Sequence, residues 1–134
     1  MNKKIELLSP AGDMERLEMA VAYGADAVYL AGEQFGMRAA ATNFSNDAML
    51  AAVAHAHAAG VKVYVTCNTL PREDELAGLP AYLEFLQEAG VDAVIVADMG
   101  VLGMAKKYAP GVKLHVSMRN IFDYVYFNSA VFFT

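Results

Sequence analysis

One short phrase, a glycine followed by an alternating and mostly apolar run, occurs four times in the chain. Its copies begin at Gly24, Gly60, Gly90 and Gly111, and each continues into aliphatic and β-branched residues. A helical pattern precedes each copy, and glycine commonly ends a helix because it adopts the left-handed conformation without strain. Apolar β-branched runs are typical of buried parallel strands. The phrase therefore predicts four transitions from a helix to a strand in a repeated βα unit.

The recurrence of this unit predicts a parallel barrel. With an opening strand near Ile5, five strands are expected, and four helices connect them. The predicted strands cover residues 5–9, 27–31, 61–67, 93–97 and 113–117. A closed eight-stranded (β/α) barrel needs about 250 residues, whereas this chain has 134. We therefore expect an α/β fold that resembles a TIM barrel but is incomplete, a half-barrel of about five parallel strands and four helices.

Two regions are expected along the chain. Residues 1–117 carry the βα pattern and form the N-terminal half of a barrel. Residues 118–134 lose that pattern and are rich in aromatic side chains, among them Tyr124 and Phe127. We interpret this second region as a divergent or truncated tail.

Composition excludes several classes of protein. The single cysteine, Cys67, rules out an internal disulfide framework and a multi-cysteine metal or iron–sulfur site within these residues. A net charge of −5 argues against a broad nucleic-acid footprint. No apolar run reaches the roughly 18 residues of a membrane span, and the start lacks the apolar core of a signal peptide. We expect a cytoplasmic protein without a metal or membrane site of its own.

Candidate catalytic residues follow from the barrel prediction, because functional groups of such barrels lie at the carboxyl ends of the strands. Asp98 and Ser117 occupy these positions, and His115 lies on the same strand as Ser117, two residues before it. Asp98 is suited to act as a general base or metal ligand, and equally to cap the helix that follows it. His115 and Ser117 share one face of their strand. A hydrogen-bonded structural histidine is the alternative for His115.

Candidate substrate-binding residues lie on the predicted loops at the same edge. They are Glu33, Arg38, Asn43, Asn68 and Thr69. The first three belong to a segment, residues 32–44, that is longer than an ordinary βα loop, and long loops on compact scaffolds are often functional. Arg38 is suited to hold a carboxylate or phosphate, or to pair with Glu33. Asn68 is suited to bind substrate or to form a turn before Pro71.

Several segments, in their order and spacing, resemble the N-terminal part of a known family. They include Glu6-Leu7-Leu8-Ser9-Pro10-Ala11-Gly12, Phe35-Gly36-Met37-Arg38-Ala39, Val63-Tyr64-Val65-Thr66-Cys67-Asn68-Thr69 and Val94-Ile95-Val96-Ala97-Asp98-Met99-Gly100. The family is that of the collagenase-like peptidases of unknown catalytic type, peptidase family U32. The resemblance covers residues 5 to 117.

This resemblance implies a bacterial or archaeal protein whose N-terminal part belongs to a peptidase that hydrolyses peptides or proteins by an unknown mechanism. It also implies an alternative, since some members serve the oxygen-independent hydroxylation of RNA bases or ubiquinone precursors. Those members resemble one another in cysteines that hold an iron–sulfur cluster further along the chain. No cofactor is therefore expected on the residues up to Thr134, which alone are expected to be inactive.

A third hypothesis is a non-catalytic module that associates with itself. Parallel strands without closure leave unpaired backbone groups and an apolar face, so we expect a dimer or a higher oligomer. A peptide or RNA substrate is expected only together with the C-terminal region that the family carries.

Overall fold

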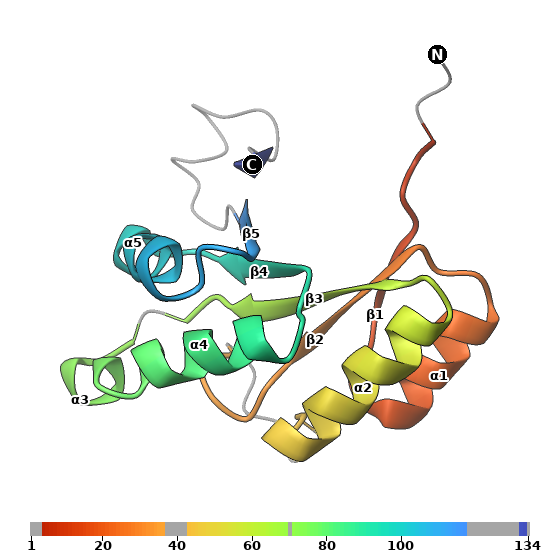
Figure 1. Cartoon of the computed structure of the whole chain (residues 1–134), viewed down its shortest axis with the longest axis horizontal. Helices are drawn as coiled ribbons and strands as arrows, with labels where there is room; N and C mark the ends of the chain where they lie inside the picture. The colour runs from red at the N-terminus through yellow and green to blue at the C-terminus, as the bar shows by residue number, and fades with distance from the viewer. Residues whose placement is uncertain (1–3, 37–42, 70, 118–131, 134) are drawn as a thin grey trace.

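The computed structural model describes residues 4–36, 43–69, 71–117 and 132–133, and these form one mixed sheet covered by helices (Figure 1). The strands are β1 (Leu8–Pro10), β2 (Ala27–Ala31), β3 (Lys62–Cys67), β4 (Ala93–Val96), β5 (Lys113–Val116) and β6 (Phe132–Phe133). They lie side by side in sequence order; β1 to β5 are parallel, and β6 pairs antiparallel with β5. Sequential order without a reversal is the winding of a (β/α) barrel and not of a doubly wound sheet. The predicted barrel-like fold is confirmed.

Five helices connect the strands in the described residues, one more than the sequence predicts. They are α1 (Met14–Ala22), α2 (Asn46–Ala58), α3 (Glu73–Leu76), α4 (Leu79–Glu88) and α5 (Met99–Tyr108). The helix that the prediction missed is α3, a single turn with no buried residue. The amide of Arg72, the N-cap residue before α3, donates to the Glu75 carboxylate at 2.9 Å. A local hydrogen bond, and not an apolar face, stabilises this turn. The sequence therefore shows no helical periodicity that would predict it.

The repeated glycines act as predicted in three copies of the phrase. Gly24, Gly60 and Gly90 have φ values of 92°, 73° and 82°, in the left-handed region that favours glycine. Gly111 does not adopt that conformation; its amide instead donates to the side-chain oxygen of Gln87 at 2.8 Å. Helix α5 therefore ends differently from the helices before Gly24, Gly60 and Gly90, which the sequence pattern did not distinguish.

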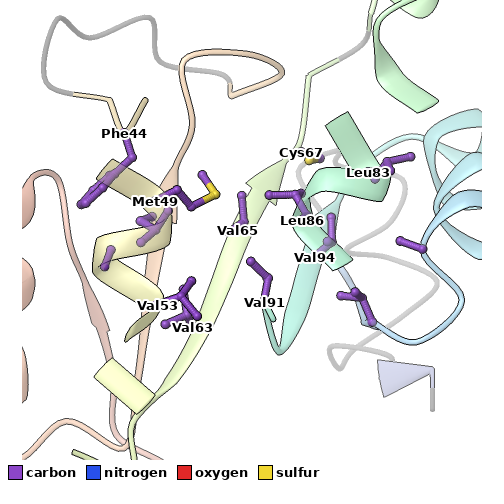
Figure 2. Close-up of a cluster of buried hydrophobic side chains, with 14 of the residues drawn as sticks. Phe44, Met49, Val53, Val63, Val65, Cys67, Leu83, Leu86, Val91 and Val94 are labelled. Atoms are coloured by element: carbon purple, nitrogen blue, oxygen red, sulfur yellow. The ribbon is translucent and has the colours of Figure 1, made fainter. Parts of the chain in front are cut away.

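Most of the apolar core lies between the helices and one face of the sheet (Figure 2). Val63, Val65 and Cys67 of β3 and Val94 of β4 point toward the helices, where they belong to the same buried cluster as Leu83 and Leu86 of α4. Helices α1, α2 and α4 run along this side of the sheet (Figure 1). On α2 the buried side chains include Met49 and Val53, whereas Leu50 is 45% exposed.

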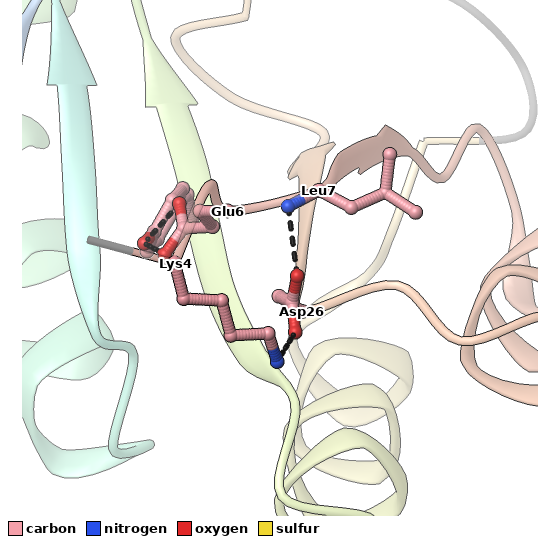
Figure 3. Close-up of polar contacts among 5 residues, drawn as sticks. Lys4, Glu6, Leu7 and Asp26 are labelled. Carbon is pink, nitrogen blue, oxygen red and sulfur yellow. Dashed lines mark hydrogen bonds and ion pairs between the residues drawn. The ribbon is translucent and has the colours of Figure 1, made fainter. Parts of the chain in front are cut away.

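Two aspartates of the repeated phrase join neighbouring strands at their amino ends. The Asp26 carboxylate accepts hydrogen bonds from the backbone of Leu7, at 2.9 Å, and from Lys4 Nζ, at 2.8 Å (Figure 3). The Asp92 carboxylate accepts in the same way from Val63 N, at 2.8 Å, and contacts the His57 ring at 2.7 Å. The first strand begins at Leu8 and not at Ile5 as predicted, and the amide of Leu7, just before it, donates to the Asp26 side chain. The two aspartates thus stabilise the register of β1 with β2 and of β3 with β4.

The first testable prediction concerns acid stability. Hydrogen bonds from Lys4 and from the Leu7 amide hold the pKa of Asp26 below its usual value. A lowered pKa in the folded state means that the carboxylate stabilises the fold above its unfolded pKa, and that this stabilisation is lost as the pH falls through the folded pKa. We expect Asp26→Asn to unfold more readily at pH 7 than the parent chain and to lose less stability below about pH 4.

Urea denaturation followed by circular dichroism at neutral and acid pH measures this effect. The matched control is Asp74→Asn, which removes an exposed carboxylate on α3. Equal pH dependence in the Asp26 variant and the parent chain would contradict the role of Asp26.

Candidate functional site

The carboxyl ends of the parallel strands gather several of the predicted residues at one edge of the sheet. Asn68 follows β3 and, at 8% exposure, is the buried polar side chain of the described core. Ser117 follows β5, and its amide extends the ladder by donating to Val96 O at 2.7 Å. Glu33 lies exposed just beyond β2. The fold therefore brings Glu33, Asn68 and Ser117 to the same edge, as expected, and their functional roles remain predictions.

Asp98 caps helix α5. Its carboxylate accepts a hydrogen bond from Val101 N at 3.0 Å, and its backbone is extended as an N-cap residue requires. This is one of the two roles that the sequence left open. A further catalytic role remains a prediction, because capping occupies only part of the carboxylate.

The loop after β2 returns along the edge of its own strand. Phe44 N donates to Ala31 O at 2.9 Å, and Glu33 N donates to Phe44 O at 3.2 Å. The hydroxyl of Thr69, after β3, donates to Phe35 O at 3.1 Å and so ties the two loops together. Phe35 has a φ of 59°, a left-handed conformation that costs energy for a residue with a side chain. Thr69 thus helps to position the loop.

Two further predicted substrate-binding residues, Asn43 and Arg38, belong to the segment between Gly32 and Phe44. Asn43 is half-buried immediately before the return of the chain at Phe44. Arg38 lies outside the described residues, so its predicted role as an anion clamp stays a prediction.

A second cluster lies on the face of the sheet that points away from the helices, which we call the open face. Its residues follow from the strand register: Tyr29 lies opposite Tyr64, Tyr64 opposite Ala93, and Ile95 opposite His115. Ala27, Tyr64 and Ala93 pack together there, with Ile95 beside them, apart from the main core. The open face therefore has a small apolar centre of its own, with polar residues around it.

Glu6, Tyr64 and His115 meet on the open face, although they lie far apart in the sequence. The Tyr64 hydroxyl lies 2.9 Å from both oxygens of the Glu6 carboxylate, to which it donates (Figure 3). The Tyr64 ring meets the His115 ring edge-on, with 4.7 Å between the ring centres. β4 separates β3 from β5. Tyr64 lies opposite the small Ala93 of β4, whereas His115 lies opposite Ile95, so the two rings meet diagonally across this strand. The tyrosine ring can therefore reach across β4 to the histidine.

The surroundings of this cluster change the pKa of both rings. Partial burial lowers the pKa of His115; Lys113 and Lys62 lower it further, and Glu6 opposes them. The lowered pKa favours the neutral form of the His115 imidazole. Burial and the Glu6 carboxylate raise the pKa of Tyr64, which keeps its hydroxyl protonated.

The residues of this chain do not fit an iron–sulfur cluster. Such clusters are held mainly by several cysteine thiolates, and the chain has one cysteine. Cys67 is 1% exposed, and burial raises the pKa of its thiol to about 12. Within the described ranges, no three His, Cys, Asp or Glu side chains gather as a metal site would require. A cluster-dependent reaction would need ligands from elsewhere.

The chain matches Peptidase family U32 over residues 12–128. It belongs to this family. The match confirms the resemblance seen in the sequence motifs, and it covers most of the chain.

Curated relatives of this family member carry two kinds of name. The chain is 41% identical over 117 residues to tRNA hydroxylation protein P1 of Bacillus subtilis, covering 87% of the chain and 28% of the relative. It is 42% identical over 114 residues to 23S rRNA 5-hydroxycytidine C2501 synthase of Escherichia coli, covering 85% of the chain and 17% of the relative. An uncharacterized protease of Methanocaldococcus jannaschii, MJ0090, is 40% identical over 115 residues, with 86% and 28% covered. The chain thus spans 17 to 28% of these three relatives.

Solved structures support the barrel fold of this U32 chain. The U32 peptidase Mk0906 superposes with a TM-score of 0.64 at 17% identity, covering 87% of this chain and 49% of that one. A xylose isomerase domain protein from Planctomyces limnophilus superposes with a TM-score of 0.54 at 15% identity, covering 90% and 55%. At these identities the likeness concerns the fold alone.

Sequence reasoning found the carboxyl edge but missed Glu6 and Tyr64. One signal was present: in the run from Lys62 to Cys67, every second residue is polar or aromatic, while the residues between them are apolar. That alternation indicates a strand with one face outside the main core. Nothing in the sequence reveals that Glu6 lies against Tyr64, because the contact joins residues 58 positions apart.

Proposed function

We propose that this chain takes part in the hydroxylation of RNA bases, as a barrel segment of an RNA hydroxylation protein. The observation that supports this most is the run of relatives with such names at 32 to 42% identity, which includes proteins of Bacillus, Escherichia, Helicobacter and Haemophilus. Two RNA classes, tRNA and 23S rRNA, appear among their names. We therefore infer a structured RNA as the substrate and a base as the reacting group.

Peptide hydrolysis is the second candidate. The family name and the archaeal relative named as a protease support it. Against it stands the chemistry of the described residues: Cys67 is buried with a raised pKa, which disfavours the thiolate that a cysteine nucleophile needs. We therefore place RNA hydroxylation first.

Deleting the gene in its own organism separates the two functions. Total tRNA and ribosomal RNA are digested to nucleosides and compared with those of the parent strain by mass spectrometry. RNA hydroxylation predicts the loss of one nucleoside that is heavier than its precursor by one oxygen atom. A peptidase predicts an unchanged nucleoside profile together with slower degradation of a protein substrate, and that result would overturn the proposal.

A further inference from the structure

We propose that Phe35, Thr69 and Tyr82 are positioning residues that hold Glu33 at the carboxyl edge of the sheet, where its carboxylate contacts the substrate. We call these three residues the loop support. That the contact serves hydroxylation rests on the proposed function, whereas the support itself rests on the geometry of the described residues. Sequence reasoning named Thr69 as a substrate-binding residue, and the support gives its hydroxyl a different role.

The backbone on both sides of Glu33 is held by contacts from separate parts of the chain. Before the support begins, the Glu33 amide donates to Phe44 O at 3.2 Å, where the chain returns to β2. Two residues later, Phe35 O accepts from the Thr69 hydroxyl at 3.1 Å, at the end of β3. The Phe35 ring packs against Tyr82 of α4, with 5.4 Å between ring centres. The peptide that carries Glu33 is therefore fixed, although its side chain is exposed.

Phe35 adopts a backbone conformation that residues with a side chain avoid. Its φ of 59° lies in the left-handed region, and among the residues that the structure describes it is the one non-glycine residue with a positive φ. Such strain persists only where the surrounding contacts impose it, and it gathers at functional sites. At Phe35 those contacts are the hydrogen bond from Thr69 and the ring of Tyr82.

Tyr82 carries a second unfavourable feature at the same place. Its hydroxyl is buried and, over the described ranges, lacks a hydrogen-bond partner. The hydroxyl oxygen lies against Gly32, so closely that a Cβ at this glycine would clash with it. Tyr82 therefore contacts the residue before Glu33 as well as the ring of Phe35. Two local costs thus meet around Glu33, and proteins retain such costs mainly where function requires them.

Glu33 is the group that the loop support presents. It lies just beyond β2 at the carboxyl edge, where functional groups of (β/α) barrels lie. An ionised carboxylate accepts hydrogen bonds, so it suits the N–H or O–H donors of a substrate. A contacting group that is oriented in advance loses less entropy on binding, and a small displacement of it lowers the rate. A fixed backbone beneath an exposed carboxylate meets this requirement.

Amide hydrogen exchange of the 134-residue chain, followed by nuclear magnetic resonance, tests the support without any substrate. Thr69→Val is nearly isosteric but removes the bond to Phe35 O, and we expect exchange of the Glu33 amide to become about tenfold faster. Thr69→Ser keeps the hydroxyl and is expected to exchange as the parent chain does. Gln87→Met is the matched control, because it removes one side-chain bond, to the Gly111 amide, at the amino ends of the strands.

The same variants of the whole gene, restored to a strain that lacks it, test the role of Glu33 in the reaction. With the protein at equal abundance, we expect Glu33→Gln to lower the ratio of hydroxylated to unmodified nucleoside by about tenfold and Thr69→Val by about threefold. Thr69→Ser is expected to keep the parent ratio. Gln87→Met loses a comparable hydrogen bond, and Glu84→Gln removes an exposed carboxylate of α4, so both should keep the parent ratio. Urea denaturation verifies that Glu33→Gln is as stable as the parent chain.

The support is wrong if the Glu33 amide of Thr69→Val exchanges as in the parent chain, or if Gln87→Met accelerates it equally. The positioning role is wrong if Glu33→Gln or Thr69→Val keeps the parent ratio while deletion removes the nucleoside, and that result leaves the proposed function standing. Unchanged nucleosides on deletion would remove the proposed function and with it the reaction that Glu33 serves. The exchange rates would then still decide whether the support holds Glu33.

Discussion

Replacing Gly32 with alanine is expected to destabilise the chain by about 1–3 kcal/mol, the range typical of overpacking in a dense core. Gly32 is buried at the carboxyl end of β2. An added methyl group would run into the Tyr82 hydroxyl oxygen and lie 3.2 Å from both Met49 Cε and Tyr82 Cζ. Tyr82 is itself buried and packs against Phe35 with 5.4 Å between ring centres. The methyl group would therefore displace α4 or the loop that follows β2.

Tyr82→Phe gives a matched test of this explanation. Within the described part of the chain, the Tyr82 hydroxyl is buried and has no hydrogen-bond partner. A buried hydroxyl without a partner has lost its hydrogen bonds to water and gained none in the protein. Removing it is therefore neutral or stabilising. We expect the Gly32→Ala, Tyr82→Phe double variant to recover more than half of the lost stability. Urea denaturation measures this, and an additive double variant would contradict the proposed clash.

Leu86→Ala is expected to lower the free energy of unfolding by about 3 kcal/mol, as truncation of fully buried leucines does. Leu86 has no exposed surface and packs from α4 into the core against β3 and β4. The matched control is Leu50→Ala on α2, where the side chain is 45% exposed and the expected loss is below about 1 kcal/mol. Thermal or urea denaturation compares the two. Equal losses would contradict the placement of the core between the helices and the sheet.

Much of the fold was predictable because its information is local. The glycines at 24, 60 and 90 need a left-handed conformation, and each is followed by a strand of apolar β-branched residues, so both ends of the transition are visible in the sequence. Asp98 was recognisable as a helix cap for the same reason. Helix α3 was not predicted, because a single hydrogen bond from an amide to the Glu75 carboxylate stabilises it and leaves no apolar pattern in the sequence. The face of α2 that enters the core is not evident from the sequence, because this helix carries alanines and other apolar residues on most of its surface.

The cluster on the open face was not predictable, because it depends on tertiary contacts. Tyr64 of β3 meets His115 of β5 diagonally across β4, and Glu6, before β1, meets Tyr64. Local patterns assign each residue a strand and a face but not a partner two strands away. The candidates at the carboxyl edge were found because functional groups of (β/α) barrels lie at the carboxyl ends of the strands. This rule predicts where a site lies but not which reaction it catalyses.

Among the described helices, none combines the length and the apolar composition that crossing a bilayer requires. This agrees with the composition of the chain, which lacks a long uncharged apolar run.

The ratio of hydroxylated to unmodified nucleoside in three strains tests the central claim most directly. The strains are the parent, the strain lacking the gene, and that strain with the gene restored on a plasmid. RNA hydroxylation predicts that one nucleoside, heavier than its precursor by one oxygen atom, disappears on deletion and returns on restoration, with its precursor changing in the opposite sense. The same ratio for every nucleoside in all three strains would contradict the account.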